Sequence, residues 1–133
     1  MQYTIDMVRE DMHGLRFKKT QLAALLSAKR EIQLQLAALI NNTTEQQAAE
    51  EQLSAVAADI GSVVAEAAKI EAKYIRAICT LKPIYRTVLI EHYIRGRVRH
   101  QIAAEINYSE RQTASLFNKA VHALVEELNK KQG

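Results

Sequence analysis

The chain has 133 residues and a formal net charge of +3, which leaves room for one ordinary domain, or for a small domain with a helical arm, and excludes most multi-domain enzymes. With one proline and four glycines, it lacks the turns that sandwiches, barrels and Rossmann folds need. Because 48% of its residues are hydrophobic and 25% are charged, we expect a soluble, all-α protein.

A first long helix is predicted from about Thr4 to Ile40. Its residues follow the alternating three- and four-residue spacing of a heptad seam, and eight of the eleven seam positions are apolar. A flanking row of Leu25, Ile32 and Leu39 widens this stripe in the second half, as expected of a helix that buries more than a narrow seam. The eleven positions are Ile5, Val8, Met12, Leu15, Lys19, Leu22, Leu26, Lys29, Gln33, Leu36 and Ile40.

A second long helix is predicted after the turn-forming segment Asn41-Asn42-Thr43-Thr44, where Thr43 with Gln46, or Thr44 with Gln47, offers a capping box. Each helix would span roughly 55 Å at 1.5 Å per residue. Residues 1–80 are therefore predicted to form a long antiparallel, coiled-coil-like hairpin. All nine seam positions of the second helix are apolar or aromatic: Leu53, Val56, Ile60, Val63, Ala67, Ile70, Tyr74, Ala77 and Leu81.

Charge favours this antiparallel pairing. Arg9 to Arg30 holds six basic and two acidic side chains, whereas Thr44 to Ala72 holds one basic and six acidic ones. An alanine-rich seam leaves apolar surface uncovered, so we expect a homo-oligomer that assembles through the hairpin. The alternatives are a spacer and a docking site for another protein. Small residues in the second helix would let another helix approach closely, although helix propensity explains them equally well: Ala57, Gly61, Ala65 and Ala68.

Three shorter helices are predicted in residues 81–133, which carry nine Lys or Arg and five Asp or Glu. Pro83 opens the first helix and Gly96 ends it, and a short helix then runs from Val98 to Ile106. Asn107 stands where a left-handed residue is needed. Ser109-Glu110-Arg111-Gln112 forms a capping box that opens a last helix to about Asn129, whose inner face is Thr113, Phe117 or Leu116, Ala120, Val121, Leu124 and Leu128. A short helix, a tight turn and a capped longer helix indicate a helix-turn-helix.

The residues of this segment also resemble region 4 of bacterial sigma factors, over roughly a third of the chain. More narrowly, they are similar to small region-4-like proteins of phages and prophages, some of which regulate transcription, including activators of late genes. The resemblance implies a sequence-specific regulator that binds double-stranded DNA. The matching residues are Leu81-Lys82-Pro83, Leu89, Tyr93, Gly96, Ile102-Ala103, Ile106-Asn107-Tyr108-Ser109, Thr113, Phe117, Ala120-Val121 and Leu124.

Three positions depart from the family pattern. Asn107 stands where glycine is usual, Val98 replaces the usual Ser or Thr cap, and Arg97 takes a place that is usually apolar. No segment resembles the promoter-melting region of a sigma factor, so we do not expect a complete sigma factor.

A helix-turn-helix presents its last helix to the major groove and holds phosphates around the start of the helix before it. The expected base contacts are Glu110, Arg111, Gln112, Ala114, Ser115 and Asn118, in which Arg111 suits guanine, Gln112 or Asn118 adenine, Glu110 cytosine and Ala114 a thymine methyl. The expected phosphate contacts are Arg95, Arg97, Arg99, His100, Gln101 and Lys119, with Lys82 and Arg86 as weaker candidates. The alternatives to DNA contact are that the basic run from Arg95 to His100 is only a solvated helix face and that Gln112 serves only as a cap.

Other classes of function find little support. Cys79, the one cysteine, excludes a disulfide framework and is expected to be buried and inert. We expect no metal site, no cofactor and no catalysis, because no metal-ligand spacing or phosphate-binding glycine loop occurs. The absence of a signal-peptide core or a long apolar run predicts a cytoplasmic protein without membrane contact. The alternatives are a small terminase subunit that recognises DNA for packaging and a protein that binds RNA polymerase or a sigma factor.

Overall fold

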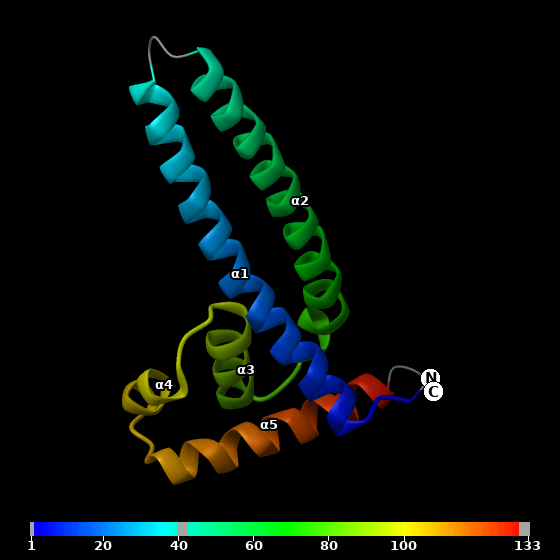
Figure 1. The fold of residues 1–133 in the computed structure, drawn as a ribbon. Coiled ribbons are helices and arrows are strands. Elements are labelled where there is room, and N and C mark those ends of the chain that lie inside the picture. Colours follow the sequence, from blue (N-terminus) through cyan, green and yellow to red (C-terminus); the bar gives the residue numbers. More distant parts are fainter. Residues whose placement is uncertain (1, 40–42, 131–133) are drawn as a thin grey trace. The chain divides into compact units, whose positions relative to one another are not determined.

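The computed structural model describes residues 2–39 and 43–130, and every regular element in these residues is helical. The all-α prediction is therefore confirmed, including the long N-terminal pair of helices. None of the described helices is long and apolar enough to cross a membrane. In chain order the elements are α1 (Ile5–Ala38), α2 (Thr43–Cys79), α3 (Pro83–Leu89), the π-helical turn η1 (Ile90–Ile94), α4 (Arg99–Ile106) and α5 (Glu110–Lys130). Figure 1 labels the α-helices.

The chain divides into two compact units, and the division differs from the sequence-based boundary at residues 80 and 81. One unit consists of Met1–Phe17 with Ala68–Gly133, and the other is Lys18–Ala67. The first turns of α1 and the last turns of α2 thus belong to the unit that contains α3, α4 and α5. Their inner residues lie in the same apolar core as α5, and this packing moves the boundary into the middle of both long helices.

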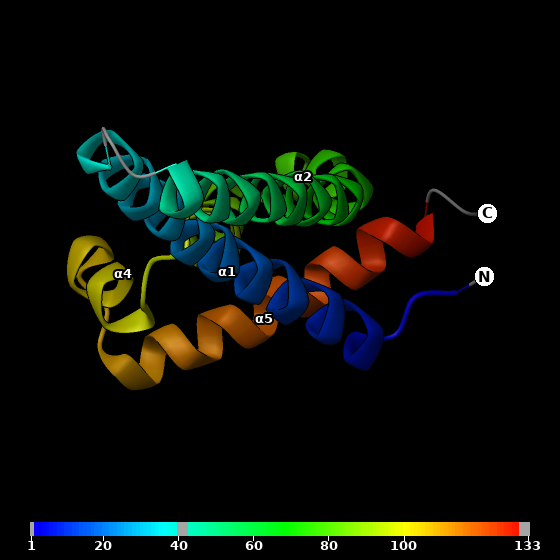
Figure 2. The ribbon, with the colours of Figure 1, turned by 45° about the horizontal axis from the view of Figure 1, so that its top comes forward.

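Within the Lys18–Ala67 unit, α1 and α2 run antiparallel and side by side, as both ribbon views show (Figures 1 and 2). An ion pair between Lys18 and Glu66 joins the two helices. The α2 seam is confirmed, since its positions in this unit are buried or half-buried: Leu53, Val56, Ile60, Val63 and Ala67. Asn41 and Asn42 of the predicted turn, and Ile40 of the predicted seam, lie outside the described residues.

The α1 seam is confirmed at most of its described positions and is wrong at Leu26 and Gln33. Val8, Met12 and Leu15 are buried, but Leu26 is 49% exposed and Gln33 is exposed as well. The predicted flanking row Leu25, Ile32 and Leu39 is confirmed, since these residues are half-buried, as are Leu22, Lys29 and Leu36 of the seam. A straight helix turns once every 3.6 residues, so a strict 3.5-residue register drifts away from its partner unless the helices supercoil.

The other unit has a continuous apolar core, built from both ends of the sequence. Residues of α1 and α2 meet there with residues of α3, η1, α4 and α5. Its largest fully buried side chains are aromatic, Tyr74 of α2 and Tyr93 of η1. The Tyr74 hydroxyl donates a hydrogen bond to Asp11, which also pairs with Lys73 at 3.2 Å. Burial and the Asp11 carboxylate raise the pKa of Tyr74, so this phenol keeps its proton and acts as a donor.

A reciprocal pair of hydrogen bonds closes this core. The Tyr3 backbone N–H donates to Asn129 Oδ1 at 2.7 Å, and Asn129 Nδ2 donates to the Tyr3 carbonyl at 3.0 Å. The segment before α1 is thereby held against the last turns of α5, which it precedes by 126 residues.

Candidate nucleic-acid interface

The turn between α4 and α5 has the geometry that the sequence predicts. Asn107 adopts the left-handed conformation, with φ 59° and ψ 38°, and the Tyr108 N–H bonds the Ala103 carbonyl at 3.0 Å. The predicted capping box is confirmed: the Gln112 N–H donates to Ser109 Oγ at 3.1 Å, and the Ser109 N–H donates to Gln112 Oε1 at 2.9 Å. These contacts fix the direction in which α5 leaves α4.

α5 separates a buried face from an exposed one. The predicted inner face is confirmed, because Thr113, Leu116, Phe117, Ala120, Val121, Leu124 and Leu128 are all buried. Arg111, Ser115 and Asn118 follow one another at four- and three-residue spacing and are all exposed. The first half of α5 thus presents a row of polar side chains to solvent, on the side away from the core.

The six expected base-contacting residues are all exposed, but three of them have partners within the protein. Gln112 completes the capping box, Glu110 lies 3.2 Å from His100 Nδ1, and Asn118 Oδ1 accepts a hydrogen bond from Arg9. The remaining three, Arg111, Ala114 and Ser115, face solvent. Among the described residues, the Arg111 guanidinium has no hydrogen bond or ion pair, so it is the side chain best able to approach a base edge.

Arg97 has a structural role that its position in a basic run conceals. Its guanidinium bonds Glu105 and lies 3.2 Å from Glu91, and its carbonyl contacts His92 Nδ1 at 2.8 Å. The hydrogen bonds to Glu105 and Glu91 raise the pKa of Arg97, while the guanidinium lowers the pKa of Glu105. With Gly96 at φ +75°, these contacts hold the loop between η1 and α4.

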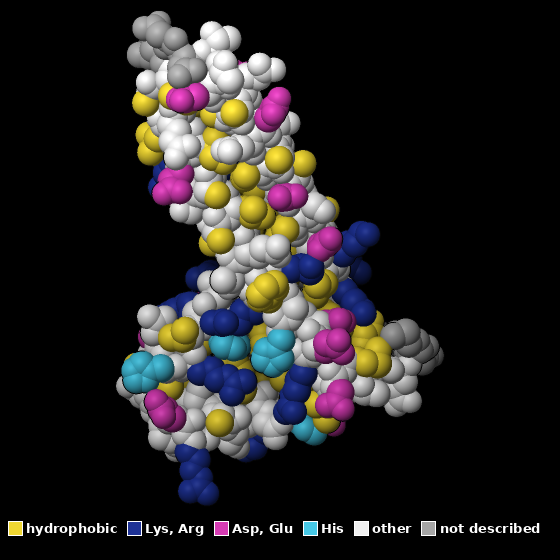
Figure 3. Space-filling model, in the orientation of Figure 1, with side chains coloured by type: hydrophobic (Ala, Val, Ile, Leu, Met, Phe, Trp, Pro, Cys, Tyr) yellow, Lys and Arg dark blue, Asp and Glu magenta, His cyan; other side chains and the backbone are white. Residues whose placement is uncertain are grey.

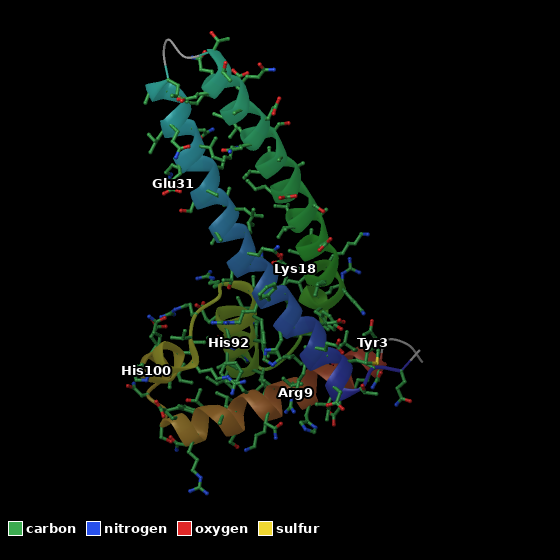
Figure 4. The ribbon with its side chains drawn as sticks, in the orientation of Figure 1. Tyr3, Arg9, Lys18, Glu31, His92 and His100 are labelled. Carbon is green, nitrogen blue, oxygen red and sulfur yellow. The ribbon has the colours of Figure 1, made fainter. Side chains whose placement is uncertain are left out.

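The other expected phosphate contacts lie at the protein surface around α4 and α5. Arg95 pairs with Glu91 at 3.4 Å, whereas the side chains of Gln101 and Lys119 are exposed and have no polar partner among the described residues. Arg99 extends over the Phe117 ring, with 4.5 Å between the guanidinium carbon and the ring centroid. Lys, Arg and His side chains gather over these helices in Figure 3, and Figure 4 labels His92 and His100 among them.

His92 is a buried residue that contacts the loop before α4, at Arg97, and α5, at Phe117. It is 8% exposed, and its ring meets Tyr93 and Phe117 edge to face, at centroid distances of 4.8 and 5.2 Å. Burial lowers the pKa of His92, an effect that the hydrogen bond to the Arg97 carbonyl opposes and the charge of Arg16 reinforces. Neutral His92 therefore donates through Nδ1 to that carbonyl and packs between aromatic rings.

Two basic residues of α1 belong to this surface and escape the sequence analysis. Arg9 bonds Asn118, and the His13 ring lies 5.4 Å from the Tyr93 ring. The basic excess between Arg9 and Arg30 is visible in the sequence, where it predicts only the pairing of the two long helices. Only the packing of α1 against α5, seen at the Arg9 label in Figure 4, brings these residues to the candidate interface.

The expectation for Cys79 is wrong, since this thiol is exposed. It lies in the last turn of α2, where Ala77 and Ile78 occupy the inward face and leave the next position to solvent. Within the residues that the structure covers, no group of three or more His, Cys, Asp or Glu is arranged to hold a metal ion. Comparison of the chain with protein-family models, curated proteins and solved structures gave no match.

Proposed function

We propose that the chain is a sequence-specific regulator of transcription, of the phage and prophage region-4-like type, which binds double-stranded DNA through α5 and acts as an oligomer. The observation that carries the proposal is the exposed row of Arg111, Ser115 and Asn118 on a helix held by a left-handed turn and a reciprocal capping box. A helix of about 10–12 Å diameter fits a major groove about 12 Å wide, and such a row would then meet base edges.

The surface charge supports the same partner. Arg99 and Lys119 are exposed on α4 and α5 near this row, as is the imidazole of His100. Cationic Arg and Lys side chains in such places hold phosphates and fix the register of a reading helix. Arg97 is different, because its guanidinium is occupied by Glu105 and Glu91. Its predicted phosphate contact would require these ion pairs to break.

Oligomer formation is proposed from the Lys18–Ala67 unit. Leu26 and Leu34 of α1 are 49% and 67% exposed, and Val64 of α2 is 45% exposed, so this unit leaves large apolar side chains in contact with water. α1 is mainly basic in this unit and α2 is mainly acidic. A second copy in antiparallel orientation would cover the apolar residues and match opposite charges.

The decisive experiment selects binding sites from a pool of randomised duplexes and then measures affinity by fluorescence anisotropy. Arg111→Ala should weaken binding to the selected site by about 5- to 150-fold, the equivalent of one bidentate base contact worth about 1–3 kcal/mol. The matched control is Arg76→Ala, which removes the same charge from an exposed position on α2. Absence of salt-dependent duplex binding by the wild type would refute the proposal.

The same preparation tests the alternatives. Light scattering should give a small oligomer, and Leu34→Glu should reduce its mass by placing a charge in the apolar surface. A ring of eight or more subunits would favour a packaging protein instead. Retention of RNA polymerase without any duplex binding would favour a polymerase-binding protein.

A further inference from the structure

A concavity of about 310 Å³ lies on one flank of α5, and three elements contribute cationic or imidazole side chains to it. Arg9 and His13 come from α1, Arg99 comes from α4, and Asn118 lies at its α5 edge. Tyr93 and Phe117 also line it. No acidic side chain is among its lining residues in the described part of the chain, so Arg9 and Arg99 border the same concavity without a carboxylate among its lining residues.

Packing holds each of these groups in place. Arg9 donates from Nη2 to Asn118 Oδ1, and Arg99 rests on the Phe117 ring. His13 meets Tyr93 edge to face, with 74° between the ring planes. Two fixed, like charges near an imidazole are unfavourable on their own and become favourable when an anion lies between them. The concavity therefore has the chemistry of an anion site.

The opposite flank of α5 resembles it in charge. A second concavity of about 340 Å³ there is lined by Lys82 and Lys119 and again by no acidic residue. Lys82 lies over the Tyr85 ring, with 5.4 Å from its nitrogen to the ring centroid. Toward the end of α5 the lining changes, and Glu126 and Glu127 enter the neighbouring concavity. Both concavities thus have basic and no acidic lining residues, and Glu110 at the start of α5 lies outside them, beside His100.

We propose that the concavity lined by Arg9, His13 and Arg99 holds a backbone phosphate of double-stranded DNA, so that α1 forms part of the reading interface. The inference rests on the proposed function. A helix lying in the major groove with the Arg111 row toward the bases turns its two flanks toward the phosphates of the two strands. Asn118 belongs both to that row and to the concavity, which makes Arg9 its direct neighbour.

Arg9 then has two roles. Its charge attracts the phosphate, and its hydrogen bond fixes the Asn118 amide, whose nitrogen is left to donate to a base. These roles can be separated by substitution. Arg9→Gln removes the charge and leaves a shorter, neutral amide donor, whereas Arg9→Lys keeps the charge and loses the planar guanidinium.

The test uses the full chain, a duplex of fixed arbitrary sequence, and anisotropy titrations at several KCl concentrations. Arg9→Gln and Arg9→Ala should each reduce the slope of log K against log salt by about 0.9, the value of one phosphate contact. Arg9→Lys and the control Arg76→Ala should keep the wild-type slope. Thermal melts establish that each variant is folded. If Arg9→Ala does not fold, Arg9→Gln, which keeps a neutral polar side chain at this position, carries the test.

The outcomes separate the two proposals. If wild type binds the duplex and Arg111→Ala reduces selected-site affinity, but Arg9→Gln keeps the wild-type slope, this inference is overturned and the proposed function stands. If wild type binds no duplex, both are overturned. Titration with inorganic phosphate is the remaining arm. If Arg9→Gln abolishes phosphate-ion binding and leaves the duplex slope unchanged, the concavity takes a free anion, and the assignment to DNA is refuted.

Discussion

Gln112 offers the sharpest test of how the structure divides α5 between folding and recognition. The sequence predicts two roles for Gln112, as a capping residue and as a residue that hydrogen-bonds adenine. In the structure its Oε1 accepts the Ser109 N–H at 2.9 Å, and its own N–H bonds Ser109 Oγ at 3.1 Å. We therefore expect Gln112→Ala to destabilise the start of α5 while leaving the base preference of the protein unchanged.

The expected change in the free energy of unfolding follows from the two hydrogen bonds of the capping box. Ser109→Ala removes the cap acceptor and should lower the free energy of unfolding by about 1 kcal/mol. Gln112→Ala removes one exposed hydrogen bond and should lower it by about 0.5–1 kcal/mol. Gln112→Glu keeps the acceptor and adds a negative charge near the positive end of the helix dipole. Its free energy of unfolding should therefore exceed that of wild type by about 0.3–1 kcal/mol.

Amide hydrogen exchange measured by NMR reports the loss of protection at the individual residues of the capping box. Exchange of the Ser109 N–H should accelerate in Gln112→Ala, and exchange of the Gln112 N–H should accelerate in Ser109→Ala, because each substitution removes the acceptor of the other residue's amide. Selection from randomised duplexes then compares base preferences. The reasoning is refuted if Gln112→Ala leaves both amides protected and changes the preferred base.

Three further outcomes are expected. Because burial lowers the pKa of His92, the unfolded chain binds a proton more tightly at this residue, and the contribution of His92 to stability is complete above about pH 6.5 and declines below it. Urea unfolding at pH 7.5 and 5.5 should therefore show a smaller change in the free energy of unfolding between the two pH values for His92→Gln than for wild type. An equal change in both proteins would contradict this. Gly61→Ala should raise the free energy of unfolding by about 0.5–1 kcal/mol, since no atom of the described residues lies within 4 Å of the added carbon. A loss of stability measured by circular dichroism would mean that a second copy packs there. Cys79 should react with one equivalent of Ellman's reagent without denaturant, and reaction only in urea would rule out its exposure.

The features that the sequence predicts well are local. The Ser109 and Gln112 side chains find each other across three residues, and the left-handed Asn107 follows from the need to end one helix and begin the next. The inner face of α5 is equally local, because a single helical period determines which positions share a side. For these elements, spacing along the chain is nearly the whole physical cause.

The features that it misses depend on long-range packing. Arg9 and Asn118 are 109 residues apart, and their contact depends on how α1 packs against α5. In the sequence Arg97 is one more cation in a basic run, and only the fold brings Glu91 and Glu105 beside it. Leu26 is exposed although the pattern predicts it to lie in the seam, because a fraction of a residue per turn decides how far the predicted stripe stays covered.

The hydrogen bonds between Tyr3 and Asn129 bear on how the protein folds during synthesis. The unit that contains them is interrupted in sequence by residues 18–67, so its core cannot close until α5 has left the ribosome. Until then the inward faces of Val8, Met12 and Tyr74 have no α5 to cover them. Contacts of such long sequence separation slow folding, whereas the helix pair between them needs only its own residues. The pair is expected to form first, and the unit with the candidate interface is completed last.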